Sequence, residues 1–548
     1  MMMRKIMNRE YDIIVIGGGP NGLLAAGYLA KAGLEVLVLE RRHEMGGGAL
    51  TEEVLLLPRS FVNTHAFFMM MVDYAPAYKD LELETRYGVK HIYPELQSVM
   101  PFKDGSVLCI YSDVERTCGS IARFSKKDAD AYRELVKKCT LYMKEFIGPA
   151  TYVQPMPALD QVGMLEKTEI GRAISEFTLK SPMDVIDEYF EDPHVKAMML
   201  HNICMWGLGP EQDGLGYLIP LYMDRMHSYR MVKGGTHALA QALIKTILEN
   251  GGKLINSVRP KKIVIENERA TGVELNDGRI FEARKAIIST IDLHQTFLQL
   301  VGEENLDQDF AGSIHGWQWE HWGFLGVHLS LEQAPHFKIA EKDPGLDRAL
   351  YYVPGYDAPE DFIGHYNSIR NGKSDPKAGY VVSFPTVHDP AQAQEGRHVC
   401  SIYKMAPFDL NGDSSNWYSL KVRQEQARGC IEVLREHVPN LTDENIRASY
   451  VSTPADYAAK FLDMTKGSFK QGAYLPLQMG YMRPNEHCST HRSPLDGLYM
   501  GGACTYPGGT ILLANGYLAA NAVAEDLGIS KWWKEPDMVT RAKGKGLL

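Results

Sequence analysis

The stretch YDIIVIGGGPNGLLAAGYLAKAGLEVLVLERRHEMGGG, residues 11–48, decides the fold. It opens with four consecutive apolar residues, 13–16, which have the length and branching of a buried parallel strand. Gly17, Gly19 and Gly22 then form a GxGxxG motif. The first glycine permits a tight turn, the second lets the backbone approach a pyrophosphate, and the third lets a helix pack closely on the strand. A buried strand followed at once by this glycine motif predicts a dinucleotide site rather than a merely structural turn.

The residues after the motif complete a βαβ unit. We expect a helix over residues 23–31 and a second strand over residues 35–39, EVLVL, which ends at Glu40. A carboxylate at this place accepts a hydrogen bond from a ribose 2′-hydroxyl and repels a 2′-phosphate. The site is therefore expected to take the adenosine of FAD or NAD and to disfavour NADP.

The run Glu40-Arg41-Arg42-His43-Glu44-Met45-Gly46-Gly47 distinguishes FAD from NAD. It resembles the E-x-R-x-x-x-G-G extension of flavoproteins in the amine oxidase and phytoene desaturase superfamily. The resemblance implies that Arg42 lies near the nucleotide and that the paired glycines let the loop pass close to the ribityl chain and the flavin. An exposed basic turn is the alternative interpretation.

Two later stretches extend the resemblance over nearly the whole chain. Residues 231–290 match the family's pattern of a helix followed by a β-meander with an Asp-Gly turn, in which the residue corresponding to Val258 contacts adenine. Residues 497–510 resemble the carotenoid desaturase C-terminal motif, where a helix N-terminus points at the flavin and stabilises its anionic reduced form. The sequence departs from that motif at Cys504, Tyr506 and Thr510, where flavin meets substrate.

The resemblance implies an α/β fold, with a Rossmann-type (GR2-like) FAD-binding domain in discontinuous segments and a mixed α+β substrate domain. The FAD-binding segments are expected at 9–72, 228–299 and 488–530, and the substrate-binding or lid segments at 73–227 and 300–487. Residues 531–548 form a basic C-terminal tail.

The expected FAD contacts come from both ends of the chain. They are Gly17, Gly19, Pro20, Asn21, Gly22, Glu40, Arg41, Arg42, Gly46, Gly47, Gly48, Ala49, Val258, Gly502, Ala503, Pro507, Gly508, Gly509, Thr510 and Ile511. The sequence leaves the catalytic residue open. The candidates are Tyr506, Thr510, His321 and His328, although a histidine is more often a satisfied core or surface residue than an acid or base.

Apolar runs at 67–71, 198–206 and 317–324 are expected to surround an apolar substrate, although an ordinary core is an equally good interpretation of the first. Amine oxidases carry a lysine on a strand near residues 322–333, and none occurs in WGFLGVHLSLEQ. The lysine position of the amine oxidases is therefore expected to be empty of lysine in this chain.

Composition excludes several classes of protein. The net charge of -10 over 548 residues argues against a nucleic-acid partner, and the eight cysteines have no spacing suited to zinc, so no metal is expected. No run reaches the eighteen apolar residues of a membrane span, and the opening MMMRKIMNRE lacks a leader's apolar region. We expect a cytoplasmic protein with reduced thiols. Trp532 and Trp533 beside lysines are either part of a plain tail or a membrane-surface foot.

These patterns predict an FAD-dependent dehydrogenase or desaturase acting on CH–CH groups. It would move a hydride between a C–H of an apolar terpenoid, carotenoid-like or alicyclic substrate and flavin N5. A double-bond isomerase or saturase of the same family, an amine oxidase-like enzyme, and a non-catalytic FAD-binding protein are the alternatives. A single GxGxxG motif favours quinone, oxygen or an electron-transfer protein as electron acceptor over a nicotinamide. The sequence does not indicate the oligomeric state.

Overall fold

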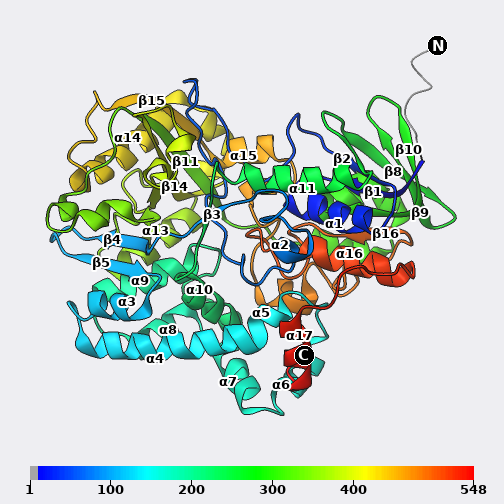
Figure 1. The fold of residues 1–548 in the computed structure, drawn as a ribbon, viewed down its shortest axis with the longest axis horizontal. Helices are drawn as coiled ribbons and strands as arrows, with labels where there is room; N and C mark the ends of the chain where they lie inside the picture. The colour runs from blue at the N-terminus through cyan, green and yellow to red at the C-terminus, as the bar shows by residue number, and fades with distance from the viewer. Residues whose placement is uncertain (1–9) are drawn as a thin grey trace.

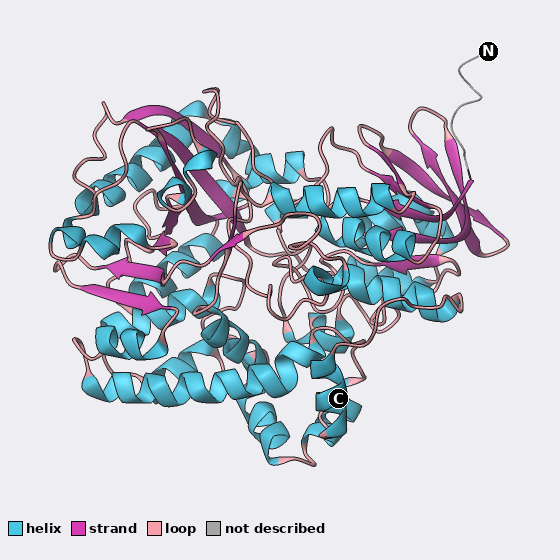
Figure 2. Cartoon of the chain, in the orientation of Figure 1, coloured by secondary structure: helices cyan, strands magenta, loops and turns pink. Residues whose placement is uncertain are grey.

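The computed structural model describes residues 10–548, which contain two large β-sheets at opposite ends of the molecule (Figure 1). Helices surround both sheets and make up most of the lower part of the view in Figure 2. Residues 1–9 lie outside the described residues. Two expectations fall on them: most of the opening MMMRKIMNRE, which is expected to lack a leader's apolar region, and the first residue of the expected segment 9–72.

The first sheet contains the predicted βαβ unit and has the order β7-β2-β1-β10-β9-β8, with β16 paired to β10. Its strands are β1 (Glu10–Ile16), β2 (Val36–Leu39), β7 (Lys253–Ile255), β8 (Pro260–Glu266), β9 (Arg269–Leu275), β10 (Ile280–Ser289) and β16 (Leu498–Met500). The strands β7, β2, β1, β10 and β16 run parallel, whereas β9 and β8 continue antiparallel. The predicted Asp277-Gly278 turn joins β9 to β10, so the predicted meander is confirmed.

The helix after the glycine motif is α1 (Pro20–Lys31), which begins three residues earlier than expected because Pro20, with its fixed φ, occupies the first helical position. It contacts α11 (His237–Glu249) and α16 (Asn515–Asp526). An added Cβ on Gly22 would lie 2.0 Å from the Gly17 carbonyl oxygen, so only glycine permits this approach of helix to strand. The packing role predicted for the third glycine is thereby confirmed.

The second sheet, at the left of Figure 1, is mixed and has the order β15-β11-β14-β13-β12-β4-β5. Its strands are β4 (Leu96–Pro101), β5 (Val107–Tyr111), β11 (Trp322–Leu331), β12 (Tyr351–Tyr352), β13 (Val381–Ser383), β14 (His398–Pro407) and β15 (Ile446–Ser452). The substrate-side segments also contain the helices α4 (Lys126–Tyr142), α8 (Pro182–Tyr189) and α9 (Pro193–Cys204). The Ser125 hydroxyl accepts from the Asp128 N–H and so caps α4.

The C-terminal tail packs onto the first sheet's helices, which favours the plain-tail interpretation over a tryptophan foot. Trp533 is only 5% exposed, and its indole N–H donates to Asn521 Oδ1 at 3.0 Å. Trp532 stacks on Tyr28 and donates to its carbonyl oxygen at 3.1 Å. Both indoles contact the ring of Tyr28 on α1, and Trp533 is buried there while Trp532 is only partly buried.

Between residues 10 and 548, no helix combines the length and apolarity that a membrane crossing needs. All eight cysteines are buried and unpaired in the structure. Within the same residues, no group of three or more histidine, cysteine or acidic side chains is arranged to hold a metal ion.

Candidate active site

A hollow of about 280 Å³ lies at the carboxyl ends of β1 and β2, and we call it the nucleotide hollow. Glu40 anchors one side of it: its Oε2 accepts from the Gly18 N–H at 2.8 Å and its Oε1 from the Arg42 N–H at 2.7 Å. These bonds fix the carboxylate at the hollow's wall, where a ribose would meet it. The lining includes Ile16, Gly17, Gly19, Leu39, Glu40, Arg41, Arg42, Gly47, Arg259, Thr290, Ile291, Phe461 and Asp463.

Unpaired polar groups beside the hollow fit a dinucleotide. Arg42 is held by Glu52 at 3.3 Å and by the Phe461 ring, yet its Nη1 is buried without a hydrogen-bond partner. The Oδ1 atom of Asn21 is unpaired in the same way, and Gly19, the residue before α1, places no side-chain cap over the helix's first N–H groups. An uncapped helix N-terminus with a nearby unpaired guanidinium nitrogen suits a pyrophosphate. The donor set of this chain therefore fits FAD.

A second space of about 140 Å³ continues from the nucleotide hollow, and we call it the apolar cavity. The two share Gly19, Gly47, Thr290, Phe461 and Asp463. The rest of the cavity is lined by Pro20, Asn21, Gly48, His65, Ala66, Phe67, Phe68, Met70, Met205, Trp206, Phe324, Tyr403, Met464, Phe469, Gln471, Ala503, Gly509, Thr510 and Ile511. A ligand can thus extend from the nucleotide hollow into an aromatic chamber.

The chamber's walls are built from the segments that the sequence indicated. Phe67 stacks on Tyr403 at 4.7 Å, Phe68 meets Trp206 edge-on at 5.2 Å, and Phe324 stacks on Phe469 at 4.8 Å. Other members of the apolar runs, among them Met198 and Met199, are buried but do not line the cavity.

Most of the expected FAD contacts lie around these two spaces. Those that line one or both are Gly17, Gly19, Pro20, Asn21, Glu40, Arg41, Arg42, Gly47, Gly48, Ala503, Gly509, Thr510 and Ile511. Those that line neither are Gly22, Gly46, Ala49, Val258, Gly502, Pro507 and Gly508. Val258, for example, donates its N–H to the Glu40 carbonyl oxygen at 3.0 Å and so supports the wall from behind.

Of the four catalytic candidates, only Thr510 lines the apolar cavity, on a loop where Thr510 and Ile511 have φ of 72° and 52°. Tyr506 turns away and donates its hydroxyl to the Ala150 carbonyl oxygen at 2.8 Å. His328 is fully buried within β11, with its Nδ1 atom 3.0 Å from Ser401 Oγ, and His321 lines a different hollow. None of these three candidates lines the apolar cavity: the strand pairing of β11 holds His328, and the Ala150 contact holds Tyr506.

His65, which the sequence interpretation passed over, lies in the cavity wall. Its ring meets Tyr457, Phe461 and Phe469 edge-on at 6.0 to 6.2 Å. Burial among these rings lowers the pKa of His65 to about 4, so the imidazole is neutral at pH 7. Its place in the stretch NTHAFFMMM was the available signal, since a lone histidine interrupts an apolar run.

Asp463 and Gln471 were also missed, because they lie in a segment without a recognised motif. Gln471 donates from Nε2 to Asp463 Oδ2 at 2.7 Å and accepts from the Cys504 N–H at 3.0 Å. Burial, with a contribution from Asp292, raises the pKa of Asp463 to about 6. The pair ties the cavity's polar corner to the C-terminal glycine-rich turns.

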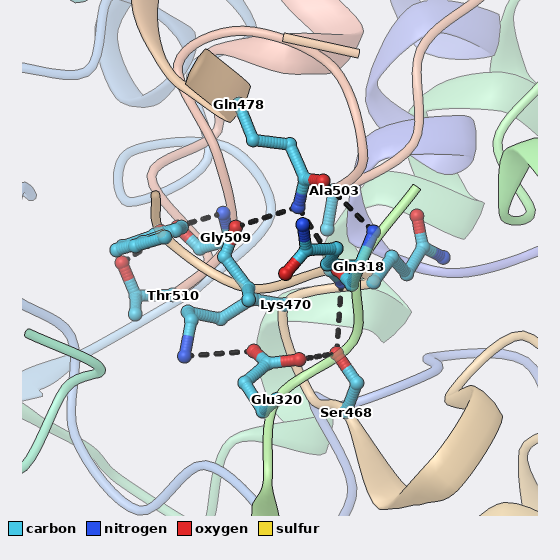
Figure 3. Close-up of polar contacts among 12 residues, drawn as sticks. Gln318, Glu320, Ser468, Lys470, Gln478, Ala503, Gly509 and Thr510 are labelled. Carbon is cyan, nitrogen blue, oxygen red and sulfur yellow. Dashed lines mark hydrogen bonds and ion pairs between the residues drawn. The ribbon is translucent and has the colours of Figure 1, made fainter. Parts of the chain in front are cut away.

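A buried lysine stands directly behind the C-terminal loop (Figure 3). Lys470 Nζ lies 2.8 Å from Glu320 Oε1, and Ser468 donates its hydroxyl to the other carboxylate oxygen. An added Cβ on Gly509 would lie 2.9 Å from Lys470 Cα, so the loop rests on this residue. No lysine occurs on β11, and Lys470 reaches the back of the C-terminal loop from another segment of the chain.

Comparisons with known proteins agree with this arrangement. A family model described as an NAD(P)-binding Rossmann-like domain matches residues 15–81. One of the subunits of limonene dehydrogenase from Castellaniella defragrans is 37% identical over 98% of this chain and 99% of its own length. A lycopene-forming phytoene desaturase of Pseudescherichia vulneris is 24% identical over 94% of this chain and 99% of its own.

Among solved structures, cyclohexylamine oxidase from Brevibacterium oxydans matches 94% of this chain and 99% of its own with a TM-score of 0.57 and 15% identity, which shows a shared fold. The 37% identity over almost the full length of both chains shows the family. The chain therefore belongs to the phytoene desaturase-like FAD-dependent oxidoreductases.

Proposed function

We propose that the protein binds one noncovalent FAD and dehydrogenates an alicyclic terpenoid of monoterpene size. The observation that carries the proposal is the continuity between the nucleotide hollow and the apolar cavity, which share five lining residues. FAD, when bound, supplies a two-electron acceptor for a hydride from carbon. The segments 9–72, 228–299 and 488–530 would hold it, and 73–227 with 300–487 would cover the substrate.

The chain's own residues have defined parts in this proposal. Glu40 would bind the ribose, the α1 N-terminus with Arg42 the pyrophosphate, and the loop at Gly509 and Thr510 would face the isoalloxazine. The aromatic walls exclude water and orient an apolar guest, which brings the reacting carbon close to the cofactor. Thr510 would face that carbon.

The substrate class rests on the cavity's chemistry. Asp463 is the only carboxylate among its described lining residues, and Gln471 already binds it. Phe68 also stacks on Tyr229 at 4.2 Å, which places a second aromatic ring behind this wall, and the cavity of about 140 Å³ suits a small guest rather than a long polyene. The relative that is 37% identical is named for limonene, a small alicyclic terpenoid. These observations favour such a substrate over an amine or a long carotenoid.

We further propose that electrons leave to quinone, oxygen or an electron-transfer protein. Peripheral contact with a membrane surface remains part of the proposal because an apolar substrate partitions into lipid; it no longer rests on the two C-terminal tryptophans, which are packed inward.

Product analysis tests the function. Holoprotein is incubated with limonene and ferrocenium as an artificial acceptor, and the organic phase is analysed by gas chromatography and mass spectrometry. Dehydrogenation predicts two ferrocenium ions reduced per limonene consumed and an oxidised product. Isomerised limonene with no acceptor reduced would instead identify an isomerase. Acid precipitation should release all the yellow colour as FAD, one per chain.

A further inference from the structure

His65 is a polar group with an unpaired ring nitrogen in a mainly apolar cavity. Its Nε2 atom is buried with no hydrogen-bond partner. Its Nδ1 atom faces the glycine loop, since an added Cβ on Gly48 would lie 3.1 Å from it, and both residues line the apolar cavity. A buried polar group left unpaired costs stability unless a ligand satisfies it. The position of His65 therefore points to a bound molecule.

The other titratable side chains of the described cavity lining are already engaged. Tyr403 donates its hydroxyl to the Asn63 carbonyl oxygen, and burial raises its pKa far above neutrality. Asp463 accepts from Gln471. His65, in contrast, makes no hydrogen bond to another side chain and keeps an unpaired ring nitrogen.

We propose that His65 is the proton acceptor of the reaction, at Nδ1. The inference rests on the proposed function. In the dehydrogenation, one C–H bond is broken with its electron pair, which leaves as hydride to the flavin oxidant. The adjacent C–H bond is broken without its pair: the proton goes to His65 Nδ1, and the pair becomes the new C=C bond. Two electrons and one proton reach the flavin, and one proton reaches the imidazole.

The electrostatic surroundings of His65 suit this task. Burial and the charge of Lys460 lower its pKa, while Glu52 opposes them, so the ring is neutral and able to accept. Departure of a hydride leaves positive charge on the substrate carbon and makes the adjacent proton strongly acidic. A weak base is therefore sufficient, and the negative charge of Glu52 would stabilise the resulting imidazolium.

The test compares His65→Gln with wild type, and uses His328→Gln as the matched control. His328 is also a buried histidine with an unpaired Nε2 and a pKa lowered by burial to about 3, but it lies outside the cavity. FAD content and limonene affinity, from perturbation of the flavin spectrum, are measured for each protein. Anaerobic flavin reduction by limonene is then followed by stopped flow.

We expect the His65→Gln protein to keep its FAD and limonene affinity while its flavin is reduced about 100- to 10,000-fold more slowly, the range of general base catalysis. The His328→Gln protein should reduce at the wild-type rate. Added imidazole should restore part of the rate to a His65→Gly variant.

A second measurement needs no turnover. In holoprotein with ¹⁵N-labelled histidine, limonene should shift the ring resonances of His65, assigned by their loss in His65→Gln, and leave those of His328 unmoved. An unmoved His65 signal, or a His65→Gln protein reduced as fast as wild type, would overturn the inference. Wild-type flavin that no terpenoid reduces would instead overturn the proposed function on which it rests.

Discussion

Lys470 and Glu320 form an ion pair of 2.8 Å in which the two side chains are 0% and 3% exposed. The ammonium lies 4.4 Å from the centre of the Phe469 ring and 4.8 Å from that of Tyr474, and the loop at Gly509 rests on its stem. Burial lowers the pKa of Lys470, and Glu320 counteracts this effect. Removal of one partner would therefore leave the other charge buried and unpaired, and this is how the pair affects stability.

Lys470→Met should lower the free energy of unfolding by about 3 to 5 kcal/mol, because it leaves the Glu320 carboxylate buried and unpaired. The double variant Lys470→Met/Glu320→Gln should recover much of this loss. Urea unfolding of the holoprotein measures both. The exposed pair Arg86–Glu249 is the control, and Arg86→Met should cost less than about 1 kcal/mol. Equal losses at the two sites would contradict the burial argument.

Glu40→Ala should weaken FAD binding by roughly ten- to a hundredfold, since a charge-assisted hydrogen bond contributes about 1.5 to 3 kcal/mol. Isothermal titration of the apoprotein with FAD gives the dissociation constant. Glu35→Ala removes a carboxylate that pairs with Arg284 at the surface, and should leave FAD affinity unchanged. If both variants bind FAD as wild type does, Glu40 does not hold the ribose.

Acid should destabilise the protein between pH 6.5 and 4. Burial lowers the pKa to about 4 for His65, His201 and His491, and to about 3 for His328 and His365. Because these folded-state values lie below the unfolded value of about 6.5, the stability they contribute is present above pH 6.5 and is lost as pH falls.

Two carboxyls oppose the histidines. Burial raises the pKa of Asp292 and Asp463 to about 6, so these groups favour the folded state below that pH. With five histidines against two carboxyls, these seven groups alone make the unfolded chain bind about three more protons near pH 5, a contribution of about 4 kcal/mol per pH unit to the slope. Urea unfolding at pH 5 and pH 6 should show lower stability at pH 5. Equal or greater stability at pH 5 would mean that the histidines are not held neutral.

Trp533→Ala should destabilise the protein by about 3 to 5 kcal/mol, as expected for removing a buried large aromatic side chain. Leu159→Ala, at a side chain that is 87% exposed, serves as the control and should change stability little. Thermal unfolding compares them, and liposome flotation of the two variants should be indistinguishable. A Trp533→Ala protein with wild-type stability and weaker flotation would restore the membrane-foot interpretation.

The sequence predicted those parts of the site that depend on neighbours in the chain. The turn at Gly17, the approach allowed by Gly22 and the position of Glu40 at the end of β2 follow from a local strand–turn–helix pattern. Thr510 was also placed correctly in the cavity wall, because a glycine-rich turn before a helix is itself a local signal.

What the sequence did not reveal depends on contacts between distant segments. Lys470 contacts Glu320, which lies 150 residues earlier in the chain, and no local sequence pattern predicts that a lysine is buried there. The tryptophans at 532 and 533 are a second example. The sequence pattern of two indoles flanked by lysines is the same whether the indoles contact lipid or pack on Tyr28.

The most direct test of the central claim is anaerobic stopped-flow reduction of the bound flavin by limonene deuterated at its allylic carbons. The account predicts that limonene bleaches the flavin absorbance, that deuterium slows the bleaching severalfold, and that putrescine and cyclohexylamine cause none. Rapid bleaching by these amines, with none by limonene or any other alicyclic terpenoid, would contradict it.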